Sequence, residues 1–303
     1  MKTTQSGSKR KVLTRRYNSW PELRDQLDRL SDGHWIFRGQ ENAAWGLTST
    51  LHRQLKGRKV RPELWNAQER RTIRIFTRKA HLFLPSLPRD LLEWLALMQH
   101  HGAPTRVLDF TWSPYVAAFF ALDNAIADAA IWALDASVLN ADKNPALRTS
   151  NKVLPPAPYP PEDDPYFGYF LESKKRTAHI LSPFVMNQRL IAQSGTFLVP
   201  TVLDAPLDEL LLEREDTARA LCKLEIATAK VRDRAMRHLY RMNINQATLF
   251  PGLDGLARSM AQELEINWKQ NATKAVSPKR SSGIIMGEDP ACRRRTGYGC
   301  GNL

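Results

Sequence analysis

The sequence predicts an α+β fold: one domain in which a small, mostly antiparallel sheet is surrounded by helices. Two observations support this prediction. Short apolar runs of strand length, at 34–37 and 130–134, alternate with segments whose apolar residues recur at helical spacing. No internal repeat divides the chain. We therefore expect the domain to cover residues 17–268, between basic, disordered tails at 1–16 and 269–303.

Helix signals are clear in the first hundred residues. Ser19 has the pattern of an N-cap, with Glu22 three residues later, and it starts an amphipathic helix. A short buried strand follows at 34–37. Two more helices are predicted, at 62–84 and at 90–101, and the second ends at Gly102, because glycine readily takes the left-handed conformation that closes a helix.

The periodicity changes after residue 104. A strand is predicted at 107–111, and Ser113 followed by a proline marks the start of a strongly apolar helix at 115–127. The later elements are predicted to be strands at 130–134, 193–199 and 221–226, and helices at 228–240 and 254–268. Six prolines between residues 155 and 165 predict a long surface loop at 140–165.

Composition narrows the class of protein. The chain has 303 residues and 43% hydrophobic content, enough for a real core, and no apolar run long enough to cross a membrane. The N-terminus lacks the apolar stretch of a secretory signal, so we expect a cytoplasmic protein. Cys222, Cys292 and Cys300 are too few and too irregularly placed for a disulfide framework or a four-ligand zinc site, and no metal site is predicted.

The net charge of +13 is concentrated at the two ends. Residues 1–16 contain six Lys or Arg and no acidic residue, and residues 266–303 contain seven against two acids. Basic tails of this kind give loose affinity for polyanions. We therefore expect weak nucleic-acid contact by the tails rather than a nucleic-acid-binding fold in the core.

Arg38 is the first candidate binding residue. The apolar strand before it places its side chain at a strand end, where the planar guanidinium can hold a phosphate or carboxylate. Gly39 has no Cβ and would let such a ligand approach the backbone. A structural ion pair is the alternative interpretation of Arg38.

A dense group of polar residues accompanies the apolar helix that starts near 113. It comprises Gln99, His100, His101, Thr105, Arg106, Asp109 and Thr111. Polar groups in such apolar surroundings need partners or a ligand. Asp109, at a strand end beside a helix N-terminus, is a functional candidate; the structural alternative is that it accepts a hydrogen bond from Arg106 or from backbone N–H groups. Asp109 with His100 or His101 would also supply the acid and base of a hydrolase.

Four blocks of the sequence resemble the FRG domain, a bacterial family named after its Phe-Arg-Gly motif. They are WIFRGQ at 35–40, QHHGAPTRVLDFT at 99–111, QRLIAQSGTF at 188–197 and ATLFPGLDGL at 247–256. The resemblance implies one FRG domain that includes all four blocks.

A more distant resemblance, to ADP-ribosyltransferases of the Arg-Ser-Glu class, implies a site. Their NAD site begins with an aromatic-Arg-Gly strand, which resembles the strand ending in Arg38 and Gly39, and residues 109–121 resemble the strand and helix that come next. The resemblance implies an ADP-ribosyltransferase-like fold and NAD as substrate. It implies catalytic roles for Arg38, Asp109 and Gln193, and NAD binding by Arg38, Gly39, Thr111 and His100.

Gln193 separates this chain from those enzymes, because it stands where they carry Glu. Cleavage of the bond between nicotinamide and ribose passes through a cation that a carboxylate stabilises and a neutral amide does not. In one alternative, Asp109 supplies the charge and the protein is a transferase of bacterial defence or toxin type with a protein or nucleic-acid target. In the other, it is a non-catalytic FRG recognition module that binds a nucleotide or a partner, and its basic tails contact nucleic acid weakly.

Overall fold

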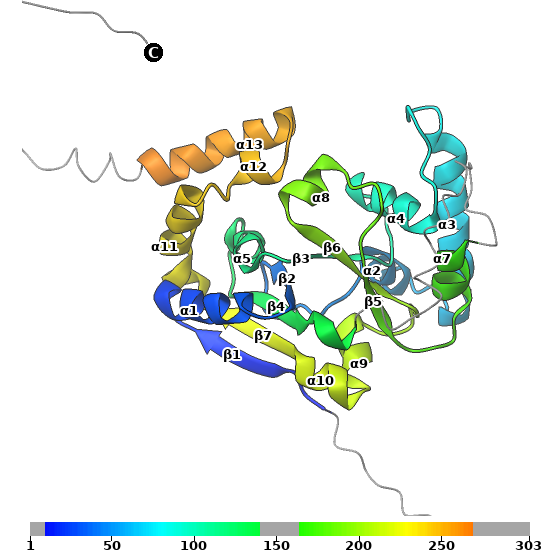
Figure 1. Ribbon diagram of the computed structural model, residues 1–303, viewed down its shortest axis with the longest axis horizontal. Coiled ribbons are helices and arrows are strands. Elements are labelled where there is room, and N and C mark those ends of the chain that lie inside the picture. The colour runs from blue at the N-terminus through cyan, green and yellow to red at the C-terminus, as the bar shows by residue number, and fades with distance from the viewer. Residues whose placement is uncertain (1–9, 140–163, 269–303) are drawn as a thin grey trace, which may run out of the picture.

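A seven-stranded sheet forms the centre of the computed structural model, which describes residues 10–139 and 164–268 (Figure 1). The strand order is β1-β7-β4-β2-β3-β6-β5, and neighbours pair antiparallel except β1 and β7. The strands are β1 Leu13–Tyr17, β2 Trp35–Gln40, β3 Leu108–Thr111, β4 Ala129–Asp135, β5 Ala178–Leu181, β6 Gly195–Pro200 and β7 Leu221–Ile226. The predicted α+β class and antiparallel preference are confirmed, but the sheet is larger than the small one expected.

Helices cover the sheet on several sides. They are α1 Trp20–Ser31, α2 Thr50–Gly57, α3 Trp65–Ala80, α4 Leu91–His100, α5 Pro114–Leu122, α7 Pro165–Phe167, α8 Gln188–Ala192, α9 Leu207–Leu212, α10 Glu215–Ala220, α11 Thr228–Arg241, α12 Gln246–Leu249 and α13 Leu253–Glu263. Short 3-10 turns occur at Pro62–Leu64 and Ala136–Val138, and π turns at Gly168–Glu172 and Leu264–Trp268. Helices α1, α5 and α11 share one core with β4 and β7, whereas α3, α4 and α7 pack at the β5–β6 end.

Side-chain caps determine several helix boundaries, and those at Ser19 and Ser113 were predicted from the sequence. The side chains of Ser19, Asp90 and Ser113 each accept a hydrogen bond from a backbone N–H of the first turn, which satisfies a donor that the helix cannot pair. Gly102, just beyond α4, has φ 76°, which glycine adopts without strain. Local sequence signals therefore account for the start of α1, α4 and α5 and for the end of α4.

Two strands differ from the sequence prediction. β1 lies in the stretch expected to be a disordered tail through residue 16, and it pairs in parallel with β7 from Leu13 to Tyr17. Its first four residues are exposed, so no alternating apolar pattern marked it. β5 was not predicted either. Residues 1–9 and 269–303 of the predicted tails, and most of the predicted loop at 140–165, lie outside the described residues.

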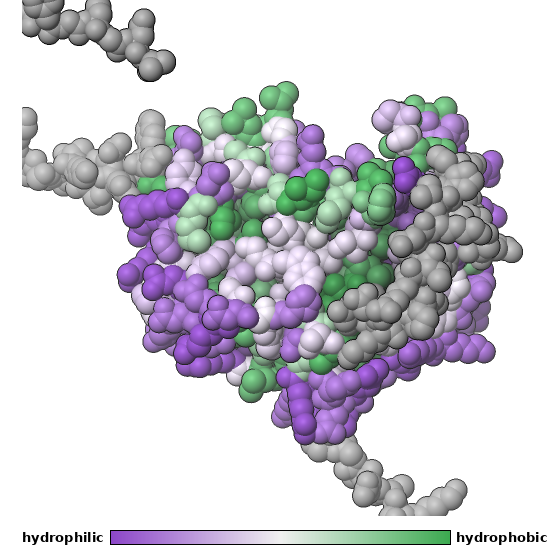
Figure 2. Space-filling view, viewed as in Figure 1, coloured by the Kyte–Doolittle hydropathy of each residue, from purple (hydrophilic) through white to green (hydrophobic). Residues whose placement is uncertain are grey.

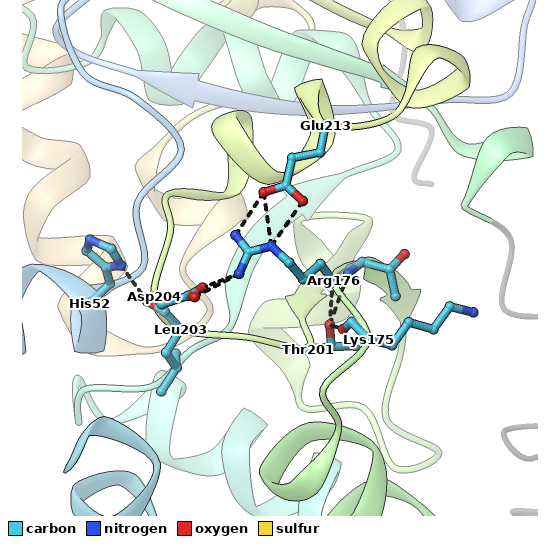
Figure 3. A network of polar contacts seen from close by, with 8 residues as sticks. His52, Lys175, Arg176, Thr201, Leu203, Asp204 and Glu213 are labelled. Carbon is cyan, nitrogen blue, oxygen red and sulfur yellow. Dashed lines mark hydrogen bonds and ion pairs between the residues drawn. The ribbon is translucent and has the colours of Figure 1, made fainter. Parts of the chain in front are cut away.

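Arg176 fastens the β5 edge of the sheet to its surroundings (Figure 3). Its Nη1 contacts Asp204 Oδ2 at 2.7 Å, and its Nη2 contacts Glu213 Oε1 at 2.8 Å, so one guanidinium joins the segment just before β5 to two later segments. Next to Asp204, the carbonyl oxygen of Leu203 contacts His52 Nδ1 of α2 at 2.8 Å. The His52 contact holds α2 against the chain that follows β6, and the Arg176 contacts hold that chain against the segment before β5.

Apolar side chains are also exposed at one end of the molecule. Figure 2 shows them gathered over α8 and α13, and the exposed apolar residues of these helices include Ile191, Leu253 and Leu256. Among the described residues, no helix is both long and apolar enough to cross a membrane.

Candidate functional site

A cavity opens where β2 and β3 separate. These neighbouring strands share a single register pair, Phe37 with Thr111, whereas β2 pairs with β4 along all six of its residues. The cavity has a volume of about 740 Å³, within the range typical of small-molecule sites. Its walls are the ends of β2 and β3, the loop at 41–48, Arg53 of α2, Phe120 of α5, and Arg189 and Gln193 at α8.

Arg38 lies where the two strands separate. Its Nη1 donates a hydrogen bond of 2.6 Å to the backbone oxygen of Asp109, and the same atom lies 3.9 Å from Asp109 Oδ2. Its Nε is buried and has no hydrogen-bond partner among the described residues. Burial lowers the pKa of the guanidinium, although Asp109 opposes this and an arginine stays charged at any physiological pH. Arg38 is therefore a cation with an unused donor beside the cavity.

Asp109 stands at the cavity wall with its side chain half exposed. Its Oδ2 accepts a hydrogen bond of 2.8 Å from Gln99 Nε2, and Gln99 Oε1 accepts one of 2.6 Å from Thr105. The alternative partner, Arg106, is fully buried elsewhere against Glu69. The sequence therefore placed Asp109 in the polar group correctly but did not identify Gln99 as its partner.

Thr111 and Gln193 close the inner end of the cavity. The Thr111 hydroxyl donates to the backbone oxygen of Gln193 at 2.7 Å and accepts from the Ser113 N–H at 3.0 Å. The Gln193 side-chain amide donates to the Leu249 oxygen at 3.0 Å, so its N–H is engaged with the α12 segment. Arg38, Asp109 and Gln193, which are far apart in sequence, thus line one cavity.

Gly39 lines the cavity with its backbone, but its missing side chain faces the core. A Cβ at this position would lie 2.0 Å from the oxygen of Ala117 and 2.6 Å from the nitrogen of Ala121, both in the α5 backbone. The expectation that a Cβ is absent to admit a ligand is therefore wrong. Glycine is required here because α5 packs directly on β2.

Arg189 is a cavity residue that the sequence interpretation missed. Its guanidinium carbon lies 4.8 Å from the centre of the Phe250 ring, and no hydrogen bond or ion pair holds it among the described residues. Burial lowers its pKa, and Asp109 counteracts this effect. The signal was its spacing: Arg189 precedes Gln193 by four residues, which places both on one side of a helical turn.

Two more charged side chains missed from the sequence complete the wall. Arg53, from α2, donates to the Thr48 oxygen and to Thr50 Oγ1. Glu41 follows β2, and its Oε1 accepts a hydrogen bond of 3.3 Å from Asn124. With Arg38, Arg189 and Asp109, the cavity holds three cationic and two anionic side chains. This excess of positive charge favours an anionic ligand.

The loop that carries Trp45 is anchored at several points. Gln40 connects it to the sheet, because its Nε2 donates to the Gly46 oxygen at 3.1 Å while its Oε1 accepts from Trp132 Nε1 at 2.7 Å. Lys223 Nζ donates to the Ala43 oxygen. Trp45 itself lines the cavity and is 53% exposed, so part of its ring is free to contact a ligand.

The two histidines do not line this cavity. The His100 and His101 rings lie 4.9 Å apart at the end of α4, and both residues are exposed. Neither makes a hydrogen bond with Asp109 among the described residues, so the acid and base of the hydrolase alternative are not assembled. The described residues also contain no cluster of His, Cys, Asp and Glu able to hold a metal ion.

Comparison with known proteins supports the family. Residues 33–130 match the model of the FRG domain, so the chain carries this domain and the recognition of it from the sequence is confirmed. The matched segment runs from the start of β2 into β4 and includes Arg38, Arg53 and Asp109; Arg189 and Gln193 lie beyond it. No curated protein and no solved structure matches the chain significantly.

Proposed function

We propose that the cavity of this FRG-domain protein binds a nucleotide with a diphosphate group, such as NAD. The observation that carries this proposal is the pair of Arg38 and Arg189, two guanidiniums with unused donors on the wall of one cavity. A diphosphate carries two anionic groups a few ångströms apart, and each suits the planar fork of a guanidinium. The distant resemblance to ADP-ribosyltransferases supports the same ligand.

Trp45 supplies the second element of a nucleotide site. Bases stack on exposed aromatic rings, and such contacts contribute about 1–3 kcal/mol per base in nucleic-acid complexes. Because the loop from Glu41 to Thr48 is held by Gln40 and Lys223, the indole is already placed before a ligand arrives. Preorganisation of this kind lowers the entropy lost on binding.

The proposal predicts a large effect of Arg38 on affinity. In calorimetric titrations with NAD, ADP-ribose, AMP and nicotinamide, we expect the two diphosphates to bind more tightly than AMP or nicotinamide. Arg38→Gln and Arg189→Gln should each weaken NAD binding about tenfold or more, because a hydrogen bond to a charged group contributes about 1.5–3 kcal/mol. Arg219→Gln is the matched control, because Arg219 is an exposed residue of α10 that does not line the cavity. NAD binding that is absent, or unchanged in both cavity variants, would contradict the proposal.

ADP-ribosyl transfer is a second candidate, favoured by the presence of Asp109 in the cavity. In that reaction nicotinamide leaves with the bonding electrons, C1′ of the ribose becomes cationic, and a nucleophile of the target attacks it. The Asp109 carboxylate would stabilise the cation. In the structure its charge is partly offset by Arg38 and Arg189 and one oxygen is held by Gln99, so we place binding first and transfer second.

Nicotinamide release separates these candidates. If the protein is a transferase, incubation with NAD should release nicotinamide, and Asp109→Asn should abolish the release while NAD still binds. If NAD binds without release, in the presence of cell extract as a source of targets, the non-catalytic recognition function stands. Glu41→Gln is the comparison variant, because Glu41 is the other carboxylate on the cavity wall.

A further inference from the structure

A second charged region lies outside the cavity, in the segment from α2 through α3. Residues 53–81 contain ten Lys or Arg and two acidic residues. One of the acids, Glu69, is buried against Arg106, so Glu63 is the only exposed acid of the segment. Among the described residues, Arg70 is the only one of the ten cations that pairs with an acidic side chain, Glu172, so the segment keeps most of its positive charge.

The outward side of α3 is a line of arginines. Arg71, Arg74 and Arg78 are exposed and follow the spacing i, i+3, i+7, which places them on one side of the helix over a length of about 10 Å. The opposite side, with Trp65 and Ile73, is buried in the protein. The helix thus uses its apolar side for the fold and turns its guanidiniums to solvent.

The turn between α2 and α3 adds further positive charge next to this line of arginines. Lys56, Arg58, Lys59 and Arg61 are all exposed between α2 and α3. The two helices are joined there, because Trp65 packs with apolar side chains of α2 in one small core. We call Lys56, Arg58, Lys59, Arg61, Arg71, Arg74 and Arg78 the α2–α3 basic face. None of the seven has an ion pair with an acidic side chain among the described residues.

Helix α11 has arginines at the same spacing as α3, but acidic residues lie beside them. Arg234, Arg237 and Arg241 also follow i, i+3, i+7. However, Asp233 adjoins them on α11, and neighbouring α11 side chains contact acids of the following segment: Tyr240 donates to Glu263, and Arg232 pairs with Glu265. Beside the seven cations of the α2–α3 basic face the described residues place two acids, Glu63 and Glu172, and Glu172 pairs with Arg70 rather than with a member of the face.

We propose that the α2–α3 basic face binds the phosphate backbone of a polynucleotide. Arginine meets phosphate oxygens bidentately, and a row of guanidiniums along a helix can contact successive phosphates. This inference does not rest on the ligand of the cavity, although Arg53 connects the two regions because it lies on the cavity wall and begins the basic segment. It also differs from tail contact, because it assigns the binding to structured residues.

A lipid surface is the competing occupant, and the structure favours a polynucleotide. A helix that lies on a membrane buries an apolar side in the headgroup region. The buried side of α3, with Trp65 and Ile73, is already occupied by the core. The exposed apolar residues near the helix are Leu64, Ile75, Leu82 and Phe83, which are fewer than the seven cations, and the last two follow the end of the helix.

Fluorescence anisotropy on the full chain tests the proposal. The probes are labelled 20-nucleotide single-stranded RNA, single-stranded DNA and double-stranded DNA, titrated at several salt concentrations. The triple variant Arg71→Gln, Arg74→Gln and Arg78→Gln should weaken binding of the preferred probe about tenfold or more. It should also reduce the salt slope of log K by about 2, the loss of three phosphate contacts on a single strand.

Two further variants make the result specific. Replacing the same three arginines by lysine keeps the charge and should retain most of the salt slope, which separates loss of binding from loss of folding. The matched triple Arg234→Gln, Arg237→Gln and Arg241→Gln on α11 should change affinity much less. Both tails are present in every variant, so a difference between the triples belongs to the helices.

The result of the polynucleotide-binding experiment can be distinguished from the result of the NAD-binding experiment on the cavity. Arg38→Gln should leave polynucleotide binding unchanged even where it removes NAD binding, and the α3 triple should leave NAD binding unchanged. Equal weakening by the α3 and α11 triples, no binding of any probe, or binding to anionic phospholipid vesicles without binding to the probes would each overturn the proposal.

Discussion

Arg106 and Arg38 are two arginines of one domain in opposite situations. Arg106 is fully buried, and its Nε and Nη2 meet both carboxylate oxygens of Glu69 while its Nη1 donates to the oxygens of Pro200 and Thr201. Arg38 makes one hydrogen bond to a backbone oxygen and keeps a buried Nε without a partner. The protein itself satisfies the hydrogen-bond donors of the Arg106 guanidinium, whereas the Arg38 guanidinium keeps a donor without a partner.

The difference shows which arginine is available for a ligand. A buried charge is stable only when it is paired and hydrogen-bonded, and Arg106 meets that requirement within the protein. Arg38 does not, and its side chain lines the cavity, so an anion that enters there would gain an ion pair with it. The predictions below test this contrast, from the largest expected effect on stability to the smallest.

Removing Arg106 should strongly destabilise the fold. Arg106→Met leaves the Glu69 carboxylate buried without its partner, which typically costs about 3–5 kcal/mol of the free energy of unfolding. Urea denaturation followed by circular dichroism measures the change. The double variant Glu69→Leu with Arg106→Met should recover much of the loss, because both charges are then removed. A single variant as stable as the wild type would show that Arg106 is not the saturated partner described above.

His179 is a second buried side chain with an unsatisfied nitrogen, and it lies outside the cavity wall. Its Nε2 has no hydrogen-bond partner among the described residues, and burial lowers the pKa of the imidazole from 6.5 to about 4, with Lys175 acting in the same direction. Between pH 6.5 and 4 the unfolded chain therefore binds a proton that the native protein does not. Stability should fall as the pH falls through this window, by about 3 kcal/mol.

A variant isolates this effect from other titrating groups. Burial raises the pKa of Asp90 to about 6, which acts in the opposite direction over much of the same window. The quantity to measure is thus the difference in unfolding free energy between wild type and His179→Phe at pH 7 and at pH 4. If this difference does not change with pH, the buried neutral imidazole is the wrong description.

Arg38→Met should change stability least. The substitution removes one hydrogen bond to Asp109 and also removes a buried, unpaired donor, so the two effects partly cancel and the net change should stay within about 1 kcal/mol. Thermal denaturation without ligand measures it. A loss as large as that of Arg106→Met would mean that Arg38 is a structural residue and would weaken the case for a binding site.

Local signals predicted much of the fold. Ser19 and Ser113 start helices because their side chains accept backbone hydrogen bonds from residues three positions later, a relation that the sequence displays directly. β1 could not be predicted in this way, since its polar residues are held by pairing with β7, more than 200 residues later. The Arg176 contacts could not be predicted from the sequence either, because they depend on where segments far apart in the chain meet.

The residues of the candidate site were likewise predicted in part from the sequence. Arg38, Asp109 and Gln193 were expected together from the distant resemblance to ADP-ribosyltransferases, and all three line one cavity. Their catalytic roles stay predictions. His100, expected at the site by the same resemblance, lies outside the cavity wall because the end of α4 turns it to solvent. Arg189 was missed, although its spacing from Gln193 placed it on the same helical turn.

Gly39 has a consequence for any chain that carries the Phe-Arg-Gly motif. Phe37 is buried in the core, and Gly39 must be small because α5 lies directly on the strand. Packing therefore explains the phenylalanine and the glycine, whereas the arginine lines the cavity. A mutational scan of folding stability should therefore find Phe37 and Gly39 intolerant and Arg38 tolerant. A variant of this chain that keeps Phe37 and Gly39 but replaces Arg38 should preserve the architecture and lose the proposed anion contact.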